Sequence, residues 1–164
     1  MKALLVIDIQ KATIGKNHNS LFKYDEDLIN KINDVIKKND TVIYIRNIMK
    51  NNIFNRLSPV HVFDGEKEAE LSAELLIKGD IVFDKYKGDA FTNPKLLNYL
   101  LNNNIDTIEI VGVDGGGCVS LTALGGLKNG LNVILNTSAI GTMLEKKYKK
   151  YYKLLEKKGA IFIQ

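Results

Sequence analysis

Short apolar runs alternate with helical patterns along the sequence, and this alternation constrains the fold more than any other feature. The first run, residues 2–8, is a continuous apolar stretch of the kind found in buried parallel strands. Five more runs predict strands, over 41–45, 81–83, 107–113, 132–135 and 160–163. Between them, the spacing of apolar residues predicts helices over 25–38, 66–77, 94–103, 118–128 and 143–157. The sequence therefore predicts an α/β fold with a six-stranded parallel sheet covered on both faces.

Nothing in the sequence divides the chain into parts. Residues 46–65 lack a period and contain Pro59, which predicts a loop rather than a linker, and no repeat or low-complexity segment is present. We therefore expect one domain over residues 1–164. No run approaches the ~20 apolar residues of a membrane span, and Asp8 interrupts the first run before a signal-peptide core could form. Because the lone cysteine, Cys118, cannot form an internal disulfide, we expect a cytoplasmic protein.

The net charge of +4 raises the question of a nucleic-acid partner. Arginine occurs only at positions 46 and 56, so the other basic residues are lysines. Bidentate recognition of phosphates and bases favours arginine. The densest lysine run, over 146–150, lies on a predicted helix and is typical of a solvated face. We therefore expect a small-molecule substrate and neither a nucleic-acid nor a membrane partner.

Three residues capable of chemistry stand where predicted strands end. Asp8 follows the first strand, Lys85 the third, and Cys118 lies just beyond the fourth. In parallel sheets, ligand sites lie at the carboxyl ends of the strands. Each residue also has a plain structural explanation: a turn cap, a solvated charge and a packed thiol. However, an ionised Asp8 after four apolar residues would be costly to bury unpaired, and Lys85 offers it a cation.

The surroundings of Cys118 favour a reactive thiol. It follows three glycines, residues 115–117, and begins a predicted helix, whose dipole and free N–H groups favour a thiolate or an oxyanion. Glycines also allow positive φ angles and a close approach to a ligand. A phosphate-binding turn is the alternative, but the sequence from Gly112 matches neither a P-loop nor a dinucleotide fingerprint, and Asp114 would repel phosphate. We expect an accessible thiol of low pKa.

Four blocks in this order resemble the isochorismatase-like cysteine hydrolases, the family of the nicotinamidases and N-carbamoylsarcosine amidases. Residues 5–10 resemble the family's opening hydrophobic-Asp-x-Gln motif. Residues 65–85 resemble its segment that ends on a lysine, and the interval from Lys85 to Phe91 keeps its Lys-to-Phe spacing. Residues 112–133 resemble the block around its nucleophile. The resemblance covers almost the whole chain.

The resemblance implies a sheet ordered 3-2-1-4-5-6, with Asp8 and Cys118 on adjacent central strands. It implies a catalytic triad of Asp8, Lys85 and Cys118, and a cis peptide near the nucleophile, at Val113–Asp114. In the implied mechanism Asp8 takes the thiol proton and Cys118 attacks a carboxamide or related carbonyl. Lys85 keeps Asp8 ionised, and the N–H groups of Asp114 and Cys118 receive the oxyanion.

The family also suggests a substrate pocket and an assembly. We expect Gln10 and Phe91 to line the pocket, although Phe91 could instead pack beneath the helix that Pro94 begins. The resemblance implies a homo-oligomer, a dimer or a tetramer. Asp114 departs from the Ala-Thr-Asp sequence common in the family, and an aspartate there disfavours an oxyanion unless its side chain points away.

A second departure concerns the metal. The nicotinamidase branch carries an Asp-x-His pair after the second strand, whereas residues 46–49 are Arg-Asn-Ile-Met, and neither His18 nor His61 has a ligand spacing. We therefore predict no metal and no cofactor. The main hypothesis is a metal-independent cysteine hydrolase that cleaves a C–N bond of a small amide or ureido substrate through a thioester. The alternatives are a nicotinamidase-like amidase and a non-catalytic binding protein that keeps the fold. Cys118 itself argues against vinyl-ether hydrolysis, because isochorismatases proper lack the cysteine.

Overall fold

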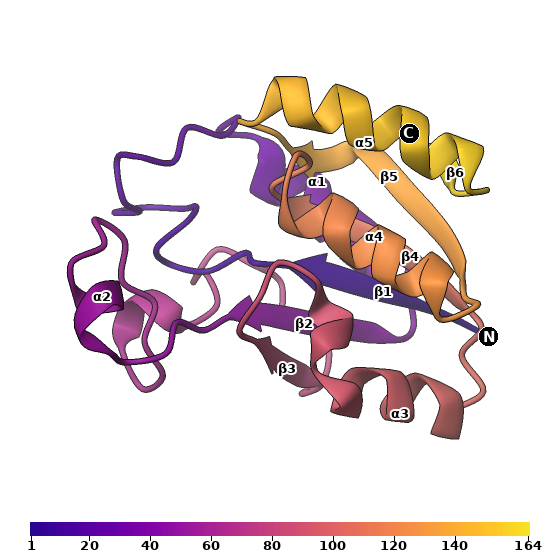
Figure 1. Ribbon diagram of the computed structural model, residues 1–164, viewed down its shortest axis with the longest axis horizontal. Helices are drawn as coiled ribbons and strands as arrows, with labels where there is room; N and C mark the ends of the chain where they lie inside the picture. Colours follow the sequence, from indigo (N-terminus) through magenta and orange to yellow (C-terminus); the bar gives the residue numbers. More distant parts are fainter.

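A six-stranded parallel sheet forms the centre of the molecule, in the order β3-β2-β1-β4-β5-β6 that the resemblance implies (Figure 1). The computed structural model describes residues 1–164. The strands are β1 (Lys2–Ile7), β2 (Val42–Asn47), β3 (Val82–Lys85), β4 (Thr107–Val113), β5 (Asn132–Gly141) and β6 (Ile161–Ile163). Every neighbouring pair is parallel, so all six carboxyl ends meet at one edge.

Helices cover both faces of the sheet, as predicted. Helix α1 (Leu28–Lys37) covers one face, and α3 (Pro94–Asn102), α4 (Cys118–Lys128) and α5 (Glu145–Lys157) cover the other (Figure 1). Alternate residues of β1 serve the two cores: Leu4 and Val6 pack on the α1 side, and Leu5 and Ile7 on the opposite side. Because both faces are covered, β1 is apolar from Ala3 to Ile7. No helix is both long enough and apolar enough to cross a membrane.

The segment between β2 and β3 differs most from the sequence-based prediction. A four-residue helix, α2 (Ile53–Arg56), interrupts the predicted loop, and the predicted helix over 66–77 is wrong. That stretch forms only the 3₁₀ turn η1 (Lys67–Ala69), an isolated bridge and a further turn, in which the Leu75 amide donates to Ser72 O. Leu71 pairs with Gln10 in an isolated bridge, and the Ser72 amide donates to Ile9 O at 2.9 Å. Pairing with the chain after β1 therefore replaces the helix that the local pattern favours.

The two central strands approach each other closely where they end. Ile7 of β1 pairs with Gly112 of β4, and a Cβ atom at Gly112 would lie 2.2 Å from the Ile7 carbonyl oxygen. Gly112 also has a φ of +119°, which L side chains rarely adopt. Glycine at this position therefore lets Asp8 and the turn before Cys118 emerge side by side.

Candidate active site

The fully buried Lys85 contacts both of the other residues that the sequence singles out, Asp8 and Cys118. Lys85 Nζ lies 2.9 Å from Asp8 Oδ2 and 3.2 Å from Cys118 Sγ. It also donates to Asn47 Oδ1 at 3.3 Å. Since β3 is two places from β1 in the sheet, the Lys85 stem must pass the end of β2 to reach Asp8. The structure thus brings Asp8, Lys85 and Cys118 together at the carboxyl edge.

Asp8 is buried, and only one of its two carboxylate oxygens has a hydrogen-bond partner. Its Oδ2 pairs with Lys85, whereas its Oδ1 has no hydrogen-bond partner. The Asp8 backbone has a φ of 55°, and it is fixed by its amide's bond to Ile45 O and by the Thr13 hydroxyl, which donates to its carbonyl at 2.7 Å. Burial raises the pKa of Asp8 above its usual range, and the Lys85 charge offsets only part of this rise. A buried carboxylate of raised pKa is a stronger base than a free one.

Cys118 is half-buried at the first position of α4. Burial and the neighbouring Asp8 raise the pKa of the Cys118 thiol to about 12, against the opposing charge of Lys85. The low pKa predicted for this thiol is therefore wrong, whereas Cys118 does line a cavity. The start of a helix favours a thiolate, but the loss of hydration and a carboxylate close by outweigh it.

Two backbone N–H groups at and before the nucleophile have no acceptor within the chain. The amides of Asp114 and Cys118 make no hydrogen bond within the chain, and the Val113–Asp114 peptide is cis. The glycines of this turn have none of the positive φ angles that the sequence suggested. They are needed for packing instead: a Cβ at Gly115 would lie 2.2 Å from the Thr142 hydroxyl, and one at Gly116 2.4 Å from Leu144 O.

Asp8 and Cys118 line a cavity of about 270 Å³. Aromatic side chains from the segment between β1 and α1 form part of its wall: Phe22 and Tyr24 stack with ring centroids 6.2 Å apart. Sequence reasoning missed both residues, because their segment has no period and carries no motif. Asn47, at the end of β2, and Met49, just beyond it, line the same cavity.

The two residues predicted to bind substrate are placed differently from each other. Gln10 lines the cavity, but its amide is engaged: Nε2 donates to Asn47 O and Ala69 O, and Oε1 accepts from Asn47 N. Phe91 does not line the cavity. It lies in the 3₁₀ turn η2 (Ala90–Thr92) and packs against the core under α4. The turn itself fits against Gly125, where a Cβ would lie 2.4 Å from Asp89 Oδ1. Phe91 therefore has a packing position, but the helix that its ring meets is α4 and not only the one that Pro94 begins.

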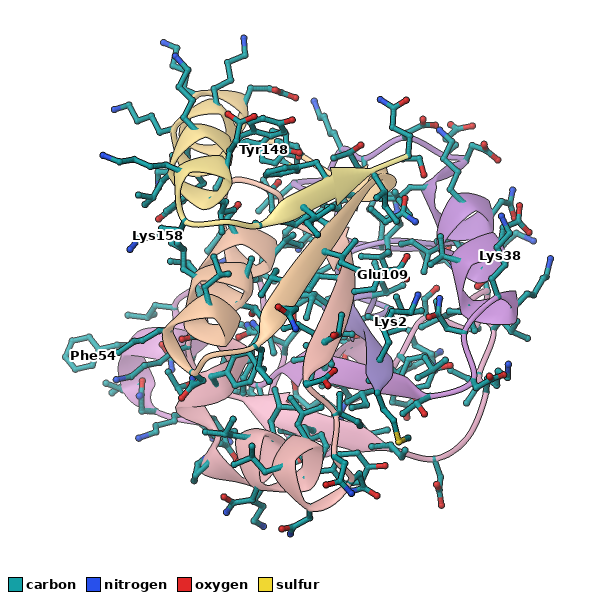
Figure 2. All side chains as sticks on the ribbon, turned by 90° about the vertical axis from the view of Figure 1, so that its right-hand side faces the viewer. Lys2, Lys38, Phe54, Glu109, Tyr148 and Lys158 are labelled. Carbon is teal, nitrogen blue, oxygen red and sulfur yellow. The ribbon has the colours of Figure 1, made fainter.

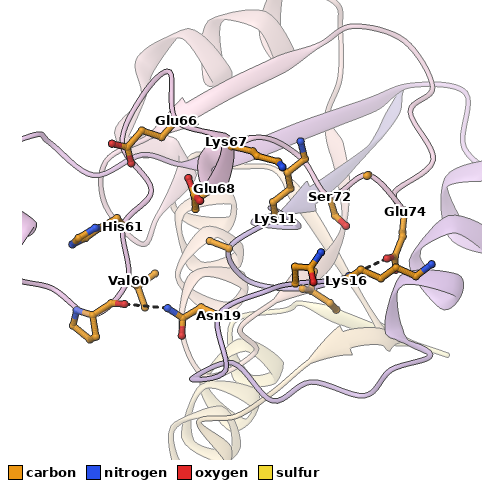
Figure 3. Close-up of a pocket in the computed structure, with 15 residues that line it drawn as sticks. Lys11, Lys16, Asn19, Val60, His61, Glu66, Lys67, Glu68, Ser72 and Glu74 are labelled. Atoms are coloured by element: carbon orange, nitrogen blue, oxygen red, sulfur yellow. Dashed lines mark hydrogen bonds between the residues drawn. The ribbon is translucent and has the colours of Figure 1, made fainter.

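A larger cavity, of about 940 Å³, lies beside the first (Figure 3). Most of the side chains that line it are polar or charged, among them Lys11, Lys16, Glu66 and Glu68, and neither Asp8 nor Cys118 is among them. Val60 lines both cavities and so belongs to the partition between them. The chemistry of the triad residues thus belongs to the smaller cavity alone.

Several solved structures, amidases among them, share this fold. PnC1 from L. infantum in complex with nicotinate matches with a TM-score of 0.89 at 20% identity, over 99% of this chain and 92% of that one. Pyrazinamidase of Pyrococcus horikoshii in complex with zinc matches with 0.85 at 22%, over 99% and 98%. N-carbamoylsarcosine amidase from Thermoplasma acidophilum matches with 0.81 at 23%, over 99% and 95%. At these identities the likeness establishes the fold.

The donor groups of this chain do not fit a zinc ion like that of the pyrazinamidase. No three His, Cys, Asp or Glu side chains lie close enough together to hold a metal. Arg46, at the end of β2, forms a bidentate pair with Asp84, at 2.7 and 2.9 Å. His18 and His61 bond to backbone carbonyls.

The sequence itself identifies the family. No protein of curated function is similar enough in sequence to match the chain. The family model described as the isochorismatase domain matches residues 2–164, nearly the entire chain. This match confirms the resemblance of the four sequence blocks, and it agrees with the sheet order and with the amidases that share the fold. The chain belongs to the isochorismatase domain family.

Proposed function

We propose that this chain is a metal-independent cysteine hydrolase that cleaves a C–N bond of a small amide or ureido substrate through a thioester at Cys118. One observation carries the proposal: the buried Lys85 ammonium contacts both Asp8 Oδ2 and Cys118 Sγ at the wall of a small cavity. A carboxylate base, a thiol and a cation shared between them are the parts that nucleophilic catalysis requires.

The raised pKa values of Asp8 and Cys118 suit a proton transfer between the two residues. Burial opposes ionisation of the thiol toward bulk water, so Cys118 is a protonated thiol at rest. Transfer of its proton to Asp8 keeps the net charge of the buried group constant, and burial therefore opposes it much less. Lys85 contacts the oxygen that loses the charge and the sulfur that gains it. The thiolate then forms only while it attacks.

The remaining steps balance with the same residues. Sulfur bonds to the carbonyl carbon, and the free amides of Asp114 and Cys118 receive the oxyanion. As the C–N bond breaks, protonated Asp8 gives its proton to the departing nitrogen. Water then attacks the thioester, loses a proton to Asp8 and releases the acid from Cys118, whose sulfur regains the proton.

An ammonia-release screen over small amides and ureido compounds tests this proposal. We expect at least one substrate to be hydrolysed by the wild type and not by Cys118→Ala. Addition of EDTA should leave the rate unchanged. Because Cys118 is the sole cysteine, the variant removes every thiol. Ammonia release that persists in Cys118→Ala would contradict the thioester route, and loss of activity with EDTA would contradict metal independence.

Two further candidates each have an observation in their favour. The nicotinate complex of PnC1 from L. infantum, which shares the fold, favours a nicotinamidase-like amidase, so nicotinamide belongs in the screen. The protonated thiol favours a binding protein that keeps the fold without turnover. Ligands that bind the wild type and Cys118→Ala equally, with no ammonia released from any, would support the binding protein.

A further inference from the structure

The carboxylate of Asp114 lies beside the nucleophile and takes no part in the steps above. It accepts hydrogen bonds from three separate segments. Oδ1 accepts from the Gly116 amide at 2.7 Å, and Oδ2 accepts from the Met143 amide at 2.5 Å and from the Tyr24 hydroxyl at 3.3 Å. One side chain thus ties the turn before Cys118 to the end of β5 and to the aromatic wall of the cavity.

The same residue organises the turn through its backbone. Its carbonyl accepts from the amides of Gly117 and Val119, at 2.9 and 3.2 Å. Its own amide and that of Cys118 remain without an acceptor in the chain. Every polar atom of Asp114 except that amide therefore holds the turn in place, and the two free amides are left available to a ligand.

Tyr24 completes this arrangement. Burial and the neighbouring Asp114 raise the pKa of Tyr24, so its hydroxyl stays protonated and donates to the carboxylate. Tyr24 also lines the cavity with Cys118.

We propose that Asp114 is a positioning residue, whose carboxylate holds the amides of Asp114 and Cys118 where they receive the oxyanion, with Tyr24 as its support. This inference rests on the proposed function and extends it. Donors to an oxyanion act by being fixed before the reaction, and a small misplacement lowers the rate steeply. The glycines next to Asp114 provide no side chains to fix the turn, so the carboxylate supplies that rigidity.

The negative charge of the Asp114 carboxylate also acts against the reaction. Its field disfavours an oxyanion on the neighbouring amides, and its removal would speed the reaction if the field dominated. Three donors face the two carboxylate oxygens and reduce that field. If positioning dominates, removal of the carboxylate slows the reaction through the oxyanion, and if the field dominates, removal speeds it. One measurement therefore separates the two.

The experiment compares two reactions of Cys118 in the full chain at one fixed pH. With p-nitrophenyl acetate, the sulfur bonds to the acetyl carbon, the thiol proton moves to Asp8 and p-nitrophenolate leaves, through an oxyanion. With iodoacetamide, the sulfur displaces iodide from carbon, and no oxyanion forms. The ratio of the two rates reports oxyanion stabilisation, and a general effect on the thiol cancels from it.

We expect Asp114→Ala to lower this ratio at least tenfold, which is about a tenth of the ~10²-fold loss at the lower end of the range for removing a whole oxyanion donor. Asp114→Asn keeps one acceptor oxygen for Gly116, and it should lower the ratio less than Asp114→Ala does. Tyr24→Phe removes only the longest of the three hydrogen bonds to the Asp114 carboxylate, and it should lower the ratio least. Asp34→Ala, on the exposed face of α1, removes the same charge far from Cys118 and should leave the ratio unchanged.

Every outcome decides the proposal. If Asp114→Ala raises the ratio, the field dominates and the proposal is wrong. An unchanged ratio with both rates reduced means a merely structural role and also overturns it. If Asp114→Ala does not fold, the order of Asp114→Asn and Tyr24→Phe decides, and an unchanged ratio in both overturns the proposal. A wild type that is alkylated but never acylated would instead refute the proposed hydrolase, and the positioning role with it.

Discussion

Each end of the sheet holds a buried carboxylate paired with a lysine, but the hydrogen-bonding of the two carboxylates differs. At the carboxyl end, Asp8 pairs with Lys85 and keeps one oxygen without a partner. At the amino end, Glu109 of β4 accepts from Lys2 Nζ at 2.6 Å and from Asn136 Nδ2 at 3.0 Å, so both oxygens are bonded (Figure 2). The pair at the amino end resembles a structural ion pair. At the carboxyl end, Asp8 keeps one oxygen free to accept a hydrogen bond.

The pKa directions of the two carboxylates reflect this contrast. Burial alone would raise the pKa of Glu109, but the hydrogen bonds from Lys2 and Asn136 lower it below its usual value. Burial raises the pKa of Asp8 despite the ammonium beside it. A fully bonded buried carboxylate is held ionised, and a partly bonded one is kept ready to accept a proton.

The largest effect is expected when the carboxyl-end pair is broken. Lys85→Met leaves Asp8 buried without a counter-charge, which should lower the free energy of unfolding by ~3–5 kcal/mol at neutral pH. The matched variant at the other end, Lys2→Met, should cost less than ~1 kcal/mol, because Lys2 is 43% exposed and Glu109 keeps other donors. Urea unfolding measures both. Equal losses would erase the contrast between the two ends.

The next effect concerns the thiol at the carboxyl end. Because burial raises the pKa of Cys118 to about 12, its alkylation by iodoacetamide should keep rising well beyond pH ~8.5, the ordinary cysteine midpoint. At that pH it should be at least about a hundredfold slower than in the same chain unfolded in urea. The pH profile of the alkylation rate measures this. A midpoint at or below ~8.5 would mean that Lys85 and the helix start outweigh burial.

A smaller effect than that of Lys85→Met is expected for Glu109→Gln at the amino end. Charge-assisted bonds to Glu109 should make the wild type more stable by ~1–2 kcal/mol at neutral pH. Because the folded pKa of Glu109 is lowered from 4.5, this contribution is present above that pH and is lost as the pH falls below it. The stability difference between wild type and variant should therefore shrink on acidification. A difference that is independent of pH would assign the loss to packing.

The sequence suffices for the framework of the site because strand positions carry that information. Asp8, Lys85 and Cys118 follow predicted strands, and the edge of a parallel sheet gathers whatever follows its strands. The family resemblance supplied the strand order, which periodicity alone does not determine.

The rest depends on contacts that no local pattern encodes. Phe22 and Tyr24 reach the cavity from a segment without period, and the stretch after η1 follows Gln10 instead of its own helical pattern. The direction of the Cys118 pKa shift depends on how deeply the thiol is buried, which spacing does not reveal. Phe91 has the family spacing and yet packs under α4, where the turn that carries it fits against Gly125.

The contact between Gly112 and Ile7 also limits how this chain can be diversified. Any side chain at Gly112 meets the Ile7 carbonyl at 2.2 Å, and the backbone there is already at a φ of +119°. A substitution would force β4 away from β1 and carry Cys118 away from Asp8. In a mutagenesis library aimed at new substrates, the residues of the cavity wall are therefore open to variation, whereas codon 112 is best held constant.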